Sequence, residues 1–256
     1  MFLLIYCLIL ANKKAPGVIF LDVGQGDASL IKAPGGQVIL LDGGPDNQVL
    51  WGLGKNLPFY RRRIDFLVLS HYHDDHLMGL IEIIKRYRVG TLIFSGESPD
   101  SLLVQELLRI ARKYGVKLQT LDGRANLAFD SNCNLSLLNP VILGIKKDPN
   151  NSLAARLDCH GQSFLFSGDN GLAVEKALLG SDWPLTANVF KASHHGSNTS
   201  NGLNFLEKVA PRLVVVSVGK ENRFGHPGVS FLERAASLGL SITRTDQAGE
   251  IKILIK

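Results

Sequence analysis

Three histidines and two aspartates lie within six residues of one another, in the run Ser70-His71-Tyr72-His73-Asp74-Asp75-His76. Imidazole nitrogens and carboxylate oxygens are good protein ligands for Zn²⁺ and Mn²⁺. A short loop can direct His71 and His73 at one ion, and the turn that follows can direct Asp75 and His76 at a second. The chain has only seven histidines in 256 residues, so this clustering favours a metal site over a solvated loop.

Other polar residues with the same chemistry follow apolar runs elsewhere in the chain. They are Asp42, Asp169 and the pair His194-His195. Loops at strand ends often carry function because the sheet fixes their position. No serine or cysteine nucleophile signature accompanies them, so the expected chemistry is attack by a hydroxide that metal ions make available at neutral pH.

The elements that must position these residues are mostly strands. Apolar and β-branched runs predict strands over 18–23, 28–32, 37–42, 64–70, 91–94, 134–139, 152–158, 162–169, 187–195, 212–219, 242–246 and 250–256. Helical spacing predicts helices over 77–87, 102–114, 171–180, 202–209 and 229–238. Two β-rich halves with interspersed helices predict an α/β (α+β) fold, with two sheets packed face to face and helices outside.

The run from His71 to His76 resembles the H-x-H-x-D-H signature of the metallo-β-lactamase superfamily. The resemblance implies a four-layer αββα sandwich with its metal site at the ends of strands. It also implies that Asp169, in Ser-Gly-Asp, bridges two ions and that His194, in His-His-Gly-Ser, is the last histidine ligand. Asp42 would then support the ligands from behind.

Four further motifs resemble the β-lactamase-like domain of ComEC-type DNA-uptake proteins. They are Asp22–Asp27, the His-His-Gly-Ser run, Gly225-His226-Pro227 and Thr245–Gly249. The resemblance covers residues 17–256, which we interpret as one hydrolase domain following an apolar segment, 1–16. It implies a metal-dependent phosphodiesterase or nuclease that acts on DNA during uptake, with a membrane channel protein as a partner.

One ligand position departs from the family pattern. Most of the superfamily has a histidine between the H-x-H-x-D-H loop and the bridging aspartate, whereas the only histidine in that interval here, His160, lies at an expected turn. Asn150 or Asn151 is the better match, and an amide oxygen shifts the preference from Zn²⁺ toward Mn²⁺. The resemblance thus implies two divalent ions. The first would be held by His71, His73 and an asparagine, the second by Asp75, His76 and His194, with Asp169 between them.

Several residues are candidates for roles beyond metal binding. Asp75, His195 and His226 are candidate catalytic residues, and Gln25, Asp27, Ser197 and Thr199 are candidate substrate-binding residues. Simpler interpretations remain open for each group. The Asp22–Asp27 run could be only a glycine-rich turn. His226 could be a structural loop histidine. His195 could be a metal ligand or a packed neighbour of His194, although His194 is favoured as the ligand. Ser197 and Thr199 could cap the following helix.

Composition limits the function classes. With 45% apolar and 20% charged residues, the chain is neither disordered nor a coiled coil. A net charge of +5 favours an anionic partner. Cys7, Cys133 and Cys159 are too few and too far apart to predict a disulfide scaffold or cysteine chemistry. Two alternatives to the nuclease remain, namely a metal-stabilised accessory or DNA-binding module with little turnover, and a hydrolase of a non-nucleic-acid ester, lactone or lactam.

The first residues are apolar. Met1–Ala11 is too short to span a bilayer by itself. It reads as a membrane anchor, as the remnant of a longer membrane helix, or as an apolar element packed on the domain. The resemblance implies a membrane-associated domain on the extracytoplasmic side, whereas Lys13 and Lys14 favour the cytoplasmic side.

Overall fold

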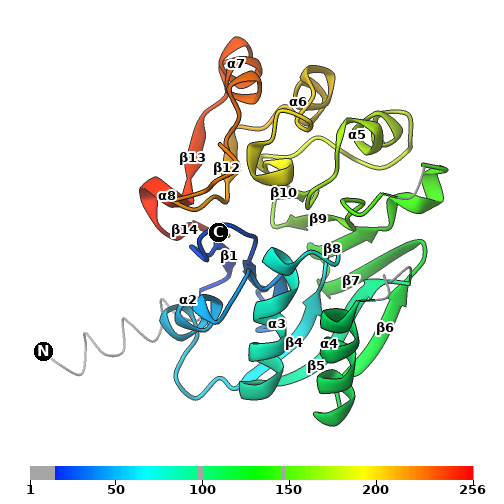
Figure 1. Cartoon of the computed structure of the whole chain (residues 1–256), viewed down its shortest axis with the longest axis vertical. Helices are drawn as coiled ribbons and strands as arrows, with labels where there is room; N and C mark the ends of the chain where they lie inside the picture. The colour runs from blue at the N-terminus through cyan, green and yellow to red at the C-terminus, as the bar shows by residue number, and fades with distance from the viewer. Residues whose placement is uncertain (1–14, 97–100, 146–147, 256) are drawn as a thin grey trace, which may run out of the picture.

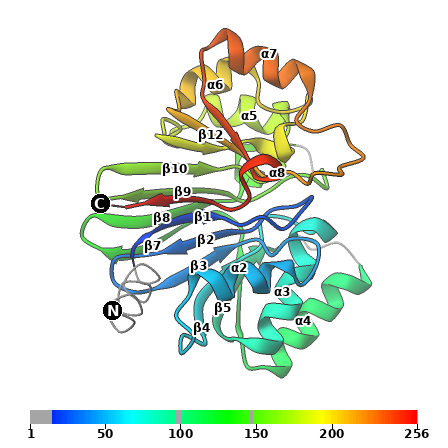
Figure 2. The same ribbon diagram turned by 90° about the vertical axis from the view of Figure 1, so that its left-hand side faces the viewer.

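The computed structural model describes residues 15–96, 101–145 and 148–255. Within these residues two seven-stranded sheets pack face to face, and helices cover the outer face of each (Figures 1 and 2). Figure 2 shows the four layers edge on, with one group of helices above the upper sheet and another below the lower sheet. The predicted αββα arrangement is therefore confirmed.

The first sheet contains the first and the last strands of the described chain. Across it, the strands are β14 (Ile251–Leu254), β1 (Gly17–Phe20), β2 (Ser29–Lys32), β3 (Val38–Leu41), β4 (Arg63–Val68), β5 (Arg88–Ser95) and β6 (Lys117–Leu121). Its outer face is covered by α2 (Gln48–Asn56), α3 (Asp74–Arg86) and α4 (Leu102–Lys113). β1 pairs antiparallel with β14 on one side and with β2 on the other.

The second sheet is built from the middle and later parts of the chain. Across it, the strands are β13 (Ile242–Arg244), β12 (Leu213–Val216), β11 (Val189–Lys191), β10 (Gln162–Phe166), β9 (Ala154–Cys159), β8 (Cys133–Leu138) and β7 (Arg124–Asp130). Its outer face is covered by α5 (Leu172–Leu179), α6 (Leu203–Val209) and α7 (Val229–Ser237). Short helices also lie in the connections after β8, β11 and β13. They are η1 (Pro140–Leu143), η2 (Ser193–Gly196) and α8 (Thr245–Ala248).

Side chains alternate between two cores along each central strand. Val18 and Phe20 of β1 point into the core between the sheets, where Phe164 of β10 also lies. Ile19 of the same strand points to the core beneath the helices of the first sheet. Because both faces of such strands are buried, they read as continuous apolar runs, which is why the sequence predicts them well.

Two strands next to each other in the second sheet are joined by a disulfide. Cys133 and Cys159 are directly opposed in the β8–β9 register, and both side chains are buried between the sheets. The sequence predicted no disulfide scaffold, and it gave no signal for this single disulfide. The antiparallel register of β8 and β9 sets the two residues opposite each other, although 26 residues separate them along the chain.

The predicted apolar segment lies outside the part that the structure describes. Residues 1–14 fall there, so the interpretations of Met1–Ala11 remain predictions. Within the described ranges, none of the helices combines the length and apolar character needed to cross a bilayer.

Candidate metal centre

The candidate site lies where the carboxyl ends of strands from both sheets meet. Parallel pairing aligns β3 with β4 in one sheet, and β10 with β11 and β12 in the other. The residues that follow these strands are the polar ones singled out above: Asp42 after β3, the His71–His76 loop after β4, Asp169 after β10, and His194 and His195 after β11. Each sheet therefore supplies part of the site.

The loop with three histidines is fixed by close backbone packing at the start of α3. The amide of Gly43 donates to the carbonyl of His76 at 2.7 Å. A Cβ on Gly79 would lie 1.8 Å from the Gly43 oxygen, so only glycine allows this approach. Asp42 accepts from the Ser70 amide at 2.7 Å and lies 2.9 Å from His76 Nδ1. Asp42 thereby fixes the orientation of the His76 ring from the side away from Asp169.

Three buried ligand atoms converge without hydrogen-bond partners among the described residues. They are His71 Nε2, His76 Nε2 and Asp169 Oδ1. His76 Nε2 lies 3.4 Å from Asp169 Oδ1, and His71 Nε2 lies 3.7 Å from Asp169 Oδ2. Buried polar atoms without partners are costly, and a cation among them would satisfy all three. The residues present therefore fit a divalent metal ion.

A second group of ligand atoms adjoins the first and shares His76. It consists of Asp75, His76 and His195. His195 Nδ1 donates to the Ser217 carbonyl at 2.9 Å, which directs Nε2 toward Asp75 Oδ2, 3.2 Å away. The sequence predicted His194 in this group, and the structure places His195 there instead.

Local backbone geometry explains why His195, and not His194, lies beside Asp75. His194 and His195 both have positive φ, at 50° and 54°, inside the tight turn η2. The turn sends the two imidazoles to different sides of Asp169. His194 Nε2 lies 3.7 Å from Asp169 Oδ2, the oxygen that also faces His71. His194 therefore faces the first group of ligands.

The remaining predicted ligands lie around these groups. The ring centroid of His73 is 4.5 Å from that of His71. Asn150 and Asn151 border a surface pocket of about 720 Å³ that Asp169 and His194 also line. The Asn150 amide nitrogen donates to Asp148 Oδ1 at 3.0 Å. The structure brings the asparagines to the mouth of the site, and metal contact by either remains a prediction.

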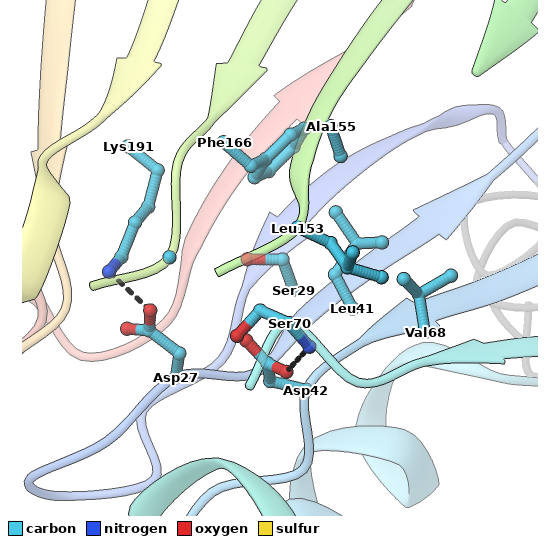
Figure 3. A pocket seen from close by; sticks show the side chains of 11 residues that line it. Asp27, Ser29, Leu41, Asp42, Val68, Ser70, Leu153, Ala155, Phe166 and Lys191 are labelled. Carbon is cyan, nitrogen blue, oxygen red and sulfur yellow. Dashed lines mark hydrogen bonds and ion pairs between the residues drawn. The ribbon is translucent and has the colours of Figure 1, made fainter. Parts of the chain in front are cut away.

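A buried lysine that the sequence analysis missed lies beneath the site. Lys191 forms an ion pair with Asp27, and both side chains are buried between the sheets (Figure 3). Asp27 Oδ1 also lies 3.4 Å from His195 Nδ1. This corrects the expectation that Asp27 binds substrate, because its carboxylate faces Lys191 and His195 instead of solvent. The sequence contained a signal for this pair, namely a lysine inside the apolar run Val189–Ala192. A lysine in such a run is buried and needs a counter-ion.

The electrostatics of the site favour a cation. Burial alone would lower the pKa of His76, but the carboxylates of Asp169 and Asp42 raise it well above its usual value. Against the same effect of burial, Asp27 and Asp169 raise the pKa of His195 to about 9. Burial and the neighbouring His76 lower the pKa of His71 well below its usual value. In the absence of a metal, protons supply the positive charge that the carboxylates attract.

Metal binding is therefore expected to release protons. In the metal-free form His195 carries a proton at pH 7, because its pKa is about 9, and the raised pKa of His76 favours its protonated form. A ligand imidazole must be neutral, so loading the site displaces up to about two protons, and metal affinity rises as the pH increases toward 9. Titration calorimetry with Zn²⁺ or Mn²⁺ in buffers of different ionisation enthalpy measures this number. An unchanged heat across buffers would contradict it.

The loop after η2 is held by a buried asparagine. The Asn201 side chain accepts from the Ser193 amide and donates to the Ser193 carbonyl, both at 2.9 Å. Glu175 in turn accepts from the amides of Asn201 and Gly202. These bonds fix Ser193, the residue before His194.

Asn201→Ala is expected to lower the free energy of unfolding by about 2–4 kcal/mol, because two buried backbone groups of Ser193 lose their partners. Urea unfolding measures the change. Asn134→Ala is the control, since the Asn134 side chain donates to Asn126 and Ser136 side chains in a part-exposed network. Equal effects of the two substitutions would contradict the prediction.

The other predicted residues surround the site. Gln25 Oε1 accepts from the Gly219 amide at 3.3 Å. Ser197 and Thr199 bond to each other at 2.9 Å, and neither caps α6, which begins after Gly202. The His226 ring lies 5.5 Å from that of His194, between centroids. Burial, with His195 and His194, lowers the pKa of His226 to about 4.

Comparison with known proteins finds a family model and several relatives that resemble this chain. Residues 21–116 match the family model described as the metallo-beta-lactamase superfamily. Two curated relatives are the ComE operon protein 3 of Bacillus subtilis and the competence protein ComA of Neisseria gonorrhoeae. The first is 27% identical, covering 93% of this chain and 33% of that protein, and the second is 29% identical, covering 90% and 31%. The chain thus spans about a third of the length of these relatives.

Solved structures show the same fold at low identity. The metallo-beta-lactamase fold protein YhfI from Bacillus subtilis aligns with a TM-score of 0.62 at 12% identity, covering 93% of this chain and all of that one. The short form of human tRNase Z aligns with a TM-score of 0.53 at 14% identity, covering 77% and 91%. The resemblance to the superfamily and to competence proteins is confirmed, and the family match supports a metal-dependent hydrolase.

Proposed function

We propose that this chain, which has the fold and the ligand motif of the metallo-β-lactamase superfamily, is a two-metal phosphodiesterase that cleaves DNA during uptake. The observation that carries the metal-dependent part is the convergence of His71 Nε2, His76 Nε2 and Asp169 Oδ1, buried and without hydrogen-bond partners among the described residues. The names of the competence relatives and the net charge of +5 support DNA as the substrate.

The proposed ligands divide into two groups. His71, His73, His194 and Asn150 or Asn151 would hold one ion, and Asp75, His76 and His195 the other, with Asp169 facing both groups. In this assignment His194 supplies an imidazole to the first ion. The stretch of chain that supplies this histidine in most of the superfamily contains only His160 here, and His160 lies at a turn. The chemistry that Zn²⁺ or Mn²⁺ supplies at such a site is hydroxide at neutral pH, because these ions lower the pKa of water.

The chain's own residues would place and stabilise the substrate. The surface pocket beside Asp169 and His194 is large enough for a nucleotide phosphodiester. His226 is neutral at pH 7, because its pKa of about 4 lies far below. A neutral imidazole keeps one N–H, which can donate to a phosphoryl oxygen as negative charge develops. Asp42, Asp27 and the Ser217 carbonyl hold His76 and His195 in orientation from behind.

The test is cleavage of single- and double-stranded DNA by the full chain with Zn²⁺ or Mn²⁺. Cleavage that requires the metal and stops on addition of EDTA is expected. A folded chain that cleaves neither DNA under either metal would overturn the proposal. DNA affinity without cleavage would indicate the accessory or binding module, and turnover of a lactone or thioester would indicate a different hydrolase.

We also place the domain on the extracytoplasmic side of a membrane, with residues 1–16 as its anchor. The buried disulfide between Cys133 and Cys159 supports this side, because disulfides persist in oxidising compartments and are rare in the cytosol. Mass spectrometry of alkylated protein from intact cells tests it. Free thiols at both positions would favour the cytoplasmic alternative.

A further inference from the structure

An exposed aromatic residue stands beside the candidate metal centre, on the loop between β12 and α7. Phe224 keeps 58% of its surface in solvent. Its ring stacks on that of His226, with centroids 5.9 Å apart and planes inclined by 22°. His226 in turn lies 5.5 Å from His194, between ring centroids. The three rings form a series that leads from solvent to the proposed ligands.

The loop holds Phe224 outward by a side-chain clamp at its base. Asn222 donates to the carbonyls of Gly219, at 3.1 Å, and His226, at 2.9 Å, and accepts from the His226 amide at 2.7 Å. Arg223 and Phe224 therefore lie at the apex of a closed loop. The Asn222 hydrogen bonds close the loop without any apolar side chain at its apex. Folding of the loop therefore does not explain why Phe224 is aromatic.

Arg223 completes a pattern typical of nucleic-acid contacts. Its guanidinium carbon lies 5.4 Å from the centre of the Phe224 ring, and its side chain is exposed. An exposed aromatic face stacks on a base of any sequence, and a neighbouring arginine attracts the adjoining phosphate. Bases within a duplex already stack on both faces, so this arrangement suits an unpaired base.

We infer that Phe224 is a stacking platform for a nucleobase of a single-stranded nucleic acid, adjacent to the phosphodiester that enters the metal centre. This inference rests on the proposed function and deepens it, because it assigns the substrate to the single-stranded class. Phe224 is accordingly a specificity-determining residue.

Phe59 provides a matched control, because it lies at the opposite end of the strands from the site. Phe59 is also an exposed phenylalanine with arginines nearby in the chain, although Tyr60 separates it from Arg61. It precedes the amino end of β4, whereas the site lies at the carboxyl ends. There Arg61 and Arg63 both bond to Asp65. A general effect of removing an exposed phenylalanine would appear in both variants.

The experiment is fluorescence anisotropy of the full chain in EDTA, with labelled oligothymidylate and an abasic oligomer of the same length. Phe224→Ala is expected to weaken binding of oligothymidylate roughly 5- to 150-fold, as measured for loss of one base–aromatic stack. Its affinity for the abasic oligomer should stay unchanged. Phe224→Trp should retain binding, Phe59→Ala should match the unaltered chain, and circular dichroism verifies folding.

Equal weakening for both oligomers, unchanged binding by Phe224→Ala, or no binding by the unaltered chain would each overturn the inference. Cleavage with added metal is scored separately. Base-dependent loss of binding in a chain that cleaves no DNA would uphold the stacking platform and reject the nuclease. Metal-dependent cleavage that is indifferent to Phe224→Ala would do the reverse.

Discussion

Exchanging Asp169 for asparagine is expected to reduce metal-dependent hydrolysis more than about 100-fold and to remove tightly bound metal. The carboxylate of Asp169 faces both ligand groups, one oxygen toward each. Oδ1 lies 3.4 Å from His76 Nε2, and Oδ2 lies 3.7 Å from the Nε2 atoms of His71 and His194. Asparagine keeps the shape and removes the charge, so the fold should survive while the site loses its central anion.

Asp130→Asn is the matched control for this prediction. Asp130 also pairs with an imidazole, that of His160 at 3.1 Å, but on the surface and away from the site. Metal content of the purified protein and the initial rate of DNA cleavage measure the effect. If Asp169→Asn binds as much metal as Asp130→Asn and cleaves as fast, Asp169 does not hold the metal.

Lys191→Met is expected to lower the free energy of unfolding by about 3–5 kcal/mol, the cost of leaving a buried carboxylate without its counter-ion. Lys191 and Asp27 are both buried beneath the site. Against the effect of burial, Lys191 and His195 hold the pKa of Asp27 below its usual value. Without Lys191 the carboxylate must either stay charged in an apolar surrounding or take up a proton.

Urea unfolding in EDTA measures this change without a contribution from bound metal. The double variant Lys191→Met, Asp27→Leu should recover part of the loss, because it leaves no unpaired charge. Arg124→Met, which breaks an exposed ion pair with Asp182, should give no measurable change. A Lys191→Met variant as stable as Arg124→Met would contradict the buried-pair argument.

The sequence predicts the central strands and the edge strands β13 and β14, but it misses the other edge strand of each sheet. β6 and β7, the final strands of their respective sheets, were not predicted. Their sequences, KLQTL and RANLAFD, carry polar or charged residues at about half their positions, because an edge strand has one face or one side in solvent. α2 was missed for a different reason, since Gly52 and Gly54 weaken its helical pattern.

For the candidate site, the sequence predicts which residue types bind metal, but it does not predict how all of them are arranged. The run from His71 to His76 and the Ser-Gly-Asp turn mark the ligand types, and the structure brings them together. Which of His194 and His195 joins Asp75 depends on two positive φ angles, and these side chains alone do not specify such angles. The Asp27–Lys191 pair depends on contact between sheets, which strand patterns do not encode.

The pairing of β1 with β14 has a consequence for folding during synthesis. β1 leaves the ribosome well before β14, together with β2 and β3, and its other edge stays open until Ile251–Leu254 has been translated. At about 5–20 residues per second, the nascent chain exposes that edge for tens of seconds at most. An open edge invites pairing with other chains. Binding of a chaperone to nascent chains halted before β14, and its release once β14 emerges, is the expected signature.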